Sequence, residues 1–210
     1  MAGSVRVGLG RLGALGAALA ALLACSSTTL QSSYLDKSYT GGPRQKVLVV
    51  GLAPQEGARR QFENAFAMGI LDAGAVGVAS SDIWTDLGEL DRERVASWVR
   101  DHGFDGVLVT HVVRLEKQTE YVPPSYSYDL YGYWGYRWGG VGPGGMVSPG
   151  YAIEREYLHL ETNLYDPATG KLVWSGHSRS FDPSERDRVI DDTVEVLVSE
   201  LQEQNLLPST

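Results

Sequence analysis

Two histidines in the C-terminal third of the chain have the spacing of a possible metal site. His159 and His177 flank a five-residue turn that is typical of a β-hairpin. If Tyr165 pairs with Lys171 across this turn, His159 lies opposite His177, and side chains at opposite positions have Cβ atoms about 5 Å apart. Glu161 lies two residues along the same face and could be a third ligand. This pattern supports one alternative function, a hydrolase or other metal-dependent enzyme, and it depends on the strand register.

The rest of the sequence contains no recognisable catalytic set. His102 falls in the last turn of a predicted helix and His111 in a predicted central strand, where structural roles are expected. There is no Ser-His-Asp spacing, no Walker loop and no HExxH. Glycine patterns at 8–13 and 140–145 match a dinucleotide fingerprint, but neither follows a predicted strand. The sequence therefore predicts a protein that is not an enzyme and has no cofactor.

Composition excludes several further classes. The chain of 210 residues carries a net charge of -8, which argues against nucleic-acid binding because phosphate contacts need a basic face. It has a single cysteine, so no internal disulfide and no cysteine-rich zinc cage can form. A hydrophobic fraction of 43% fits a globular domain.

The single cysteine follows a predicted export signal. Residues 1–24 combine two arginines with a 13-residue apolar segment, 12–24, which is too short to span a bilayer. Leu22-Leu23-Ala24-Cys25 resembles the lipobox of bacterial lipoproteins, which implies cleavage before Cys25 and acylation of that cysteine, with palmitate among the lipids. The alternative is an ordinary signal peptide. Ser26, where an aspartate would favour the inner membrane, resembles the pattern of outer-membrane lipoproteins facing the periplasm. Cleavage removes two arginines and no acid, so the net charge falls from -8 to -10.

The mature chain is predicted to comprise a flexible tether, residues 25–45, and one α/β domain, residues 46–208. Ser, Thr and Gly dominate the tether, which lacks apolar periodicity. Hydrophobic patterning then predicts strands at 46–52, 75–80, 105–121, 156–165 and 171–181. It predicts helices at 56–72, at 88–102 and from about 182 to 207. The order β-α-β-α-β-β-β-α predicts a single mixed sheet of about five strands with helices packed on it.

Several short motifs along this domain resemble one group of envelope lipoproteins. They are Phe62-Glu63, Gly74-Ala75-Val76, Gly103-Phe104-Asp105-Gly106-Val107, and the turn from Leu164 to Ser175 with its Asp-x-x-Thr-Gly-Lys-Leu-Val-Trp pattern. The stretch 46–207 resembles domains similar to the TolB N-terminal fold. That group includes the curli-secretion lipoprotein, the activator lipoproteins of penicillin-binding proteins and several domains of unknown function. The resemblance implies the fold and a non-catalytic, protein-binding function, and it brings no catalytic residues.

Residues 121–151 are predicted to form a long loop. They hold nine of the chain's 20 aromatic residues, with eight Gly, four Pro and two charged residues. Tyr and Trp offer large contact areas with few rotatable bonds, which favours binding of a partner. The alternative is a flexible insertion that covers a sheet edge, and insertion into the membrane interface is a further version of contact. The candidate contact residues are Tyr126, Tyr128, Tyr131, Tyr133, Trp134, Tyr136 and Trp138.

Together these features predict a lipid-anchored, non-catalytic lipoprotein of the cell envelope. Its expected partners are the membrane, through Cys25, and another envelope protein or peptidoglycan.

Overall fold

The computed structural model describes residues 27–53, 55–85, 92–123, 125–127 and 146–209. Within them, one six-stranded mixed sheet has the order β1-β8-β7-β4-β2-β3, and β5 and β6 form a separate two-stranded sheet. β2 is parallel to β3 and β4, and the other pairs are antiparallel. The predicted α/β class with a single mixed sheet is confirmed, with six strands in place of about five. The strands are β1 Thr28–Leu35, β2 Lys46–Leu52, β3 Val76–Ala79, β4 Gly106–Val122, β5 Ser125–Ser127, β6 Met146–Ser148, β7 Tyr151–Tyr165 and β8 Leu172–Phe181.

The helices lie close to their predicted places. They are α1 Glu56–Asp72, α2 Arg92–Asp101 and α4 Arg186–Glu203, with a short 3-10 helix at Ser80–Asp82. Gly74 follows α1 at φ 89°, where a glycine avoids the strain that a side chain would bring. No helix in the described part of the chain is long and apolar enough to cross a membrane.

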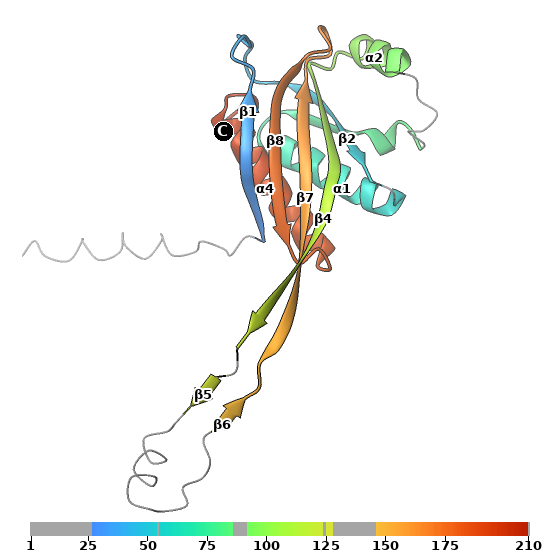
Figure 1. Ribbon diagram of the computed structural model, residues 1–210. Helices are drawn as coiled ribbons and strands as arrows, with labels where there is room; N and C mark the ends of the chain where they lie inside the picture. The colour runs from blue at the N-terminus through green and yellow to red at the C-terminus, as the bar shows by residue number, and fades with distance from the viewer. Residues whose placement is uncertain (1–26, 54, 86–91, 124, 128–145, 210) are drawn as a thin grey trace, which may run out of the picture.

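The main hydrophobic core lies between the sheet and the two long helices. Figure 1 shows α1 and α4 on the same face of the sheet. They pack there around Trp174, Leu164 and Leu108, all of them almost fully buried. A smaller cluster under α2 contains Leu48 and Phe104. α1 approaches β3 so closely that a Cβ on Gly77 would lie 2.5 Å from the backbone oxygen of Ala67.

The sixth strand, β1, corrects the prediction of a tether over residues 25–45. β1 pairs along β8 at the edge of the sheet. Its inward-facing Thr28 is 2% exposed, and its hydroxyl contacts the hydroxyls of Ser180 at 2.7 Å and Thr193 at 3.2 Å. A buried cluster of hydroxyls thus holds the start of β1, while Leu30 and Leu35 pack against the core from partly buried positions. Leu30 and Leu35 do not alternate regularly along the strand, so hydrophobic periodicity does not reveal it.

A second correction concerns the predicted loop 121–151, whose two ends are strands. β4 and β7 pair as far as Val122 opposite Tyr151. β2 pairs with β4 only as far as His111, and β8 pairs with β7 only from Tyr157. A two-stranded hairpin therefore projects beyond the body (Figure 1). We call it the arm: residues 117–122 of β4 and 151–156 of β7, prolonged by β5 and β6. The predicted strands at 105–121 and 156–165 already include residues 117–121 and 156 of the arm. Residues 122, 125–127, 146–148 and 151–155 are strand where no strand was predicted.

Candidate functional site

The register predicted for the histidine hairpin is wrong. Tyr165 pairs with Leu172, one residue beyond the predicted Lys171, and a β-bulge between Leu164 and Tyr165 adds a second residue. Every pair from Leu164 toward the start of β7 is therefore shifted by two residues from the prediction. His159 lies opposite Arg179, and His177 lies opposite Glu161. The two imidazoles are therefore not opposed. Within the described ranges, no group of three His, Cys, Asp or Glu side chains could hold a metal ion.

Each of these histidines contacts a carboxylate instead. His159 Nε2 lies 2.8 Å from Glu116 Oε2, and His177 Nε2 lies 3.3 Å from Glu161 Oε2. Glu161 of β7 lies between His111 of β4 and His177 of β8. His111, Glu161 and His177 therefore form one row across these three strands. The side-chain amide of Asn163 lowers the pKa of Glu161; burial opposes this, and His111 and His177 lower the pKa further.

A buried ion pair escaped the sequence analysis. Glu63 is fully buried, and its Oε1 accepts hydrogen bonds from Arg59 Nε at 3.0 Å, the Gly51 N–H at 2.8 Å and the Ser80 hydroxyl at 2.7 Å. Its Oε2 accepts the Ser81 N–H at 2.7 Å. Burial raises the pKa of Glu63, but these hydrogen bonds outweigh it, and the pKa lies below its usual value.

Arg59 extends this network to the loop after β3. Its guanidinium also donates to the carbonyls of Trp84 and Thr85. Since both Glu63 oxygens accept hydrogen bonds, the pair joins α1, the end of β2 and this loop. The signal in the sequence is the spacing 59, 63, 66 and 70, which places two charged residues on the buried face of α1 with Phe66 and Ile70.

An apolar cavity of about 180 Å³ opens between the N-terminal turns of α1 and α4, at the carboxyl end of β2 and beside residues 110–112 of β4, where the pairing of β4 with β2 ends. Arg59 is among its lining residues, but its guanidinium is bound as described above. The walls are otherwise mostly aliphatic and aromatic, so the cavity suits an apolar group. They include Leu52, Ala58, Phe62, Val112, Leu158, Leu160, Val189 and Ile190.

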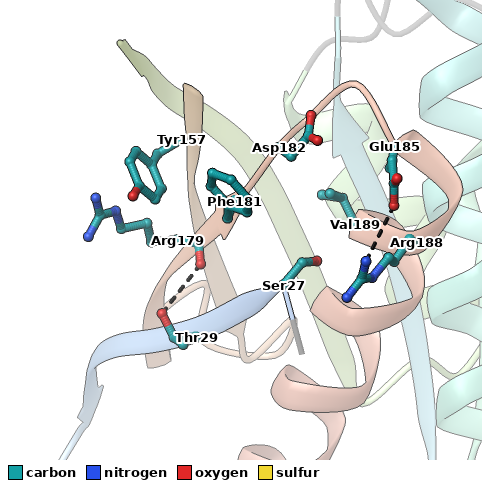
Figure 2. Close-up of a pocket in the computed structure, with 9 residues that line it drawn as sticks. All are labelled: Ser27, Thr29, Tyr157, Arg179, Phe181, Asp182, Glu185, Arg188 and Val189. Carbon is teal, nitrogen blue, oxygen red and sulfur yellow. Dashed lines mark hydrogen bonds and ion pairs between the residues drawn. The ribbon is translucent and has the colours of Figure 1, made fainter. Parts of the chain in front are cut away.

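A larger cavity, of about 380 Å³, lies where β1 begins, β8 ends and α4 starts (Figure 2). The rings of Tyr157 and Phe181 lie with their centroids 5.6 Å apart, and the Arg179 guanidinium lies 3.6 Å from the Tyr157 centroid. On the opposite wall, Arg188 contacts Glu185 at 3.4 Å. This cavity therefore combines an aromatic surface with both cationic and anionic groups. Its lining is Ser27, Thr29, Tyr157, Arg179, Phe181, Asp182, Glu185, Arg188 and Val189. We call it the Ser27 pocket.

The chain is held firmly at the edge of this pocket. Ser27 donates its N–H and its hydroxyl to Asp192 Oδ2 at 2.5 and 2.6 Å, and its carbonyl accepts the Phe181 N–H at 2.8 Å. Cys25, the predicted lipidation site, lies outside the described residues, two positions before Ser27.

The candidate contact residues of the arm are described only in part. Tyr126 belongs to β5, where it pairs with Val147. The other candidates, from Tyr128 to Trp138, lie outside the described residues. At the base of the arm, Tyr121 is 65% exposed and Tyr151 54% exposed. The neighbouring ion pairs are Lys117–Glu156 at 2.5 Å and Arg155–Glu120 at 3.0 Å.

Comparison with known proteins gives a family match over part of the chain. Residues 105–200, from β4 into α4, match a family described as a domain of unknown function (DUF4136). The comparison with curated proteins finds no match.

Several solved structures are distantly similar to this chain. The PelC dodecamer from Paraburkholderia phytofirmans shares 13% identity at a TM-score of 0.44, over 85% of this chain and 98% of that one. Lipoprotein GNA1162 from Neisseria meningitidis shares 16% identity at a TM-score of 0.41, over 76% of this chain and 99% of that one. A putative neuraminyllactose-binding hemagglutinin homolog from Helicobacter pylori shares 10% identity at a TM-score of 0.39, over 82% and 94%. At these values no residue role is transferred to this chain.

Proposed function

We propose that this protein is a lipoprotein of the cell envelope, anchored through Cys25 in the outer membrane and facing the periplasm. It acts without chemistry, as an accessory protein that binds another envelope component, protein or peptidoglycan, through its arm. The lipobox-like sequence Leu22-Leu23-Ala24-Cys25 supports the anchor.

The observation that carries the binding role is the arm itself. A two-stranded hairpin is marginally stable alone in water. Neither edge of the arm has a neighbouring strand among the described residues, because β2 ends its pairing at His111 and β8 begins its pairing at Tyr157. Open strand edges are templates for the addition of another strand. With Tyr121 and Tyr151 exposed beside them, these edges are suited to a partner.

Photo-crosslinking in intact cells tests this proposal. A photoreactive phenylalanine analogue replaces Tyr121 or Tyr151 in the arm, and Tyr34 in a matched control. Tyr34 is 55% exposed, but it lies on β1, outside the arm. We expect a discrete adduct from both arm positions and none from Tyr34.

The nature of the adduct identifies the partner class. An adduct whose electrophoretic mobility changes after muramidase digestion contains peptidoglycan. An adduct that a muramidase leaves unchanged, and whose tryptic peptides include those of a second protein by mass spectrometry, contains a protein. No adduct from either arm position, or an identical set of adducts from Tyr34, would contradict binding through the arm.

A further inference from the structure

We infer that the end of the domain around Ser27 is a membrane-docking surface, and that the Ser27 pocket lies against zwitterionic phospholipid headgroups. This inference rests on the anchor at Cys25 proposed above. It adds a fixed orientation of the domain on the bilayer and a second contact with lipid.

The first argument is the length of chain between anchor and domain. Ser27 is fixed by its hydrogen bonds to Asp192 and Phe181. Two residues at full extension span about 7 Å. The acyl chains of a lipidated Cys25 enter the hydrocarbon region, so its backbone lies at the level of the headgroups. The Ser27 end of the domain is therefore held within about 7 Å of that level.

The second argument is the chemistry of the pocket. Aromatic rings and arginines are the side chains found most often at the level of the headgroups. Tyr157 and Phe181 supply the rings, and the Arg179 guanidinium, stacked on Tyr157, has the planar donor geometry that suits a phosphate. Phe181 is 41% exposed, as contact with lipid requires.

The charges of the pocket distinguish a zwitterionic headgroup from a purely anionic one. Arg188 contacts Glu185 at 3.4 Å and Asp192 at 3.9 Å, so its charge is largely compensated. Asp182 and Glu185 line the wall opposite Arg179 (Figure 2). A headgroup with a phosphate and an ammonium group, as in phosphatidylethanolamine, complements Arg179 on one side and these carboxylates on the other.

The other end of the sheet provides the internal control. The turn between β7 and β8, which contains Ala168, follows Tyr165. Tyr165 is eight residues along β7 from Tyr157, or about 26 Å. Docking through the Ser27 end therefore places Ser184, next to the pocket, near the lipid, and Ala168 far from it. Both side chains are exposed and neither lines the pocket.

Fluorescence quenching in the lipidated protein tests this orientation. Cys25 is the only cysteine and its thiol is blocked by acylation, so Ser184→Cys or Ala168→Cys can be labelled alone with a fluorophore. The proteins are reconstituted into vesicles of phosphatidylethanolamine and phosphatidylglycerol that contain a lipid with a headgroup quencher. We expect quenching several-fold stronger at position 184 than at 168. Equal quenching at the two positions would overturn the inference.

Mass analysis of the same samples separates the two proposals. If the mature chain carries no acyl groups on Cys25, the proposed anchor fails and the inference fails with it. If Cys25 is acylated but position 184 is quenched no more than position 168, the docking surface is wrong while the anchored binding protein stands.

A chain without its anchor tests the headgroup contact. The mature chain with Cys25→Ser is sedimented with vesicles of phosphatidylethanolamine and phosphatidylglycerol, with or without Arg179→Gln. We expect weak sedimentation that Arg179→Gln reduces several-fold and that Arg114→Gln, a change at an exposed arginine outside the pocket, leaves unchanged. Absence of sedimentation, or equal loss with both changes, would overturn the headgroup contact.

Discussion

Glu63→Gln removes the charge from the buried ion pair while it keeps the size of the side chain. In the native protein, Oε1 accepts three hydrogen bonds and Oε2 one, from Gly51, Arg59, Ser80 and Ser81. A glutamine must turn its NH₂ group toward donors at one of these positions. It also leaves the Arg59 guanidinium, which is 6% exposed, without its carboxylate.

The expected loss of stability follows from these contacts. Removing one partner of a buried ion pair costs about 3–5 kcal/mol, and whole domains are stable by only about 5–15 kcal/mol. The sign of the pH dependence is also fixed, because the pKa of Glu63 is lowered in the folded protein. A carboxyl group whose pKa is lowered by folding stabilises the folded state at pH values above its pKa in the unfolded chain, about 4.3. This contribution is lost as the pH falls through the pKa of the folded state. The difference between wild type and Glu63→Gln therefore shrinks in acid.

Urea unfolding of both proteins, followed by tryptophan fluorescence at pH 7 and at several pH values below 5, measures this difference. Glu56→Gln is the matched control. Glu56 forms an ion pair with Arg60 at the same i, i+4 spacing and the same 3.0 Å, but both side chains are about half exposed. It should cost no more than about 0.5 kcal/mol. A loss below about 1 kcal/mol for Glu63→Gln, or one that does not shrink with falling pH, would refute the reasoning.

Three further predictions concern packing, metal and anchoring. Gly77→Ala should destabilise the protein by about 1–3 kcal/mol, because its Cβ would meet the backbone of α1. Gly57 lies in α1, and a Cβ there would meet no atom within 4 Å, so Gly57→Ala should stabilise the protein by about 0.5–1 kcal/mol. If urea unfolding finds Gly77→Ala to be the more stable of the two variants, the close packing of α1 on β3 is contradicted. Zinc analysis after dialysis should find no stoichiometric metal in the wild type or in His177→Ala. If the wild type holds one zinc per chain and His177→Ala loses it, the observed register of β7 and β8 is contradicted. Cys25→Ala should abolish lipid labelling and release the protein from membranes; a variant that remains membrane-bound would exclude the anchor.

Regular hydrophobic patterns predicted the central elements well. α1 was predicted at 56–72 and the first buried strand at 46–52, and both are observed with those bounds. β1 was missed because its inward positions include Thr28, whose burial depends on hydroxyl partners from β8 and α4. Such a strand has no apolar alternation, and only its long-range partners identify it.

The functional site was harder to predict because it depends on register and on contacts distant in sequence. A turn one residue longer than predicted and the bulge between Leu164 and Tyr165 together shift the register by two residues, so that the two histidines are not opposite each other; nothing in the local turn sequence signals this. The prediction placed residues 117–121 and 156 of the arm in strands but missed β5 and β6, because each has three residues and lies next to Pro124 or Pro149. The Ser27 pocket joins the start of β1 with the end of β8, which are about 150 residues apart in the chain.

The position of β1 limits how freely the arm can move to reach a partner. A flexible tether of twenty residues would let the domain explore roughly 25 Å around its anchor, in every orientation. With the anchor proposed at Cys25, only two residues would separate the lipid from Ser27, which would remove most of this freedom. β1 and β7 start at the same end of the sheet, so the arm leaves the domain at the Ser27 end (Figure 1). The domain and a partner in the same membrane then meet by diffusion in two dimensions, at a high effective concentration. Binding also costs less rotational entropy, because the domain is already oriented on the bilayer. In the proposed docked orientation the arm points toward the bilayer (Figure 1), which would favour a partner at or within the membrane over peptidoglycan.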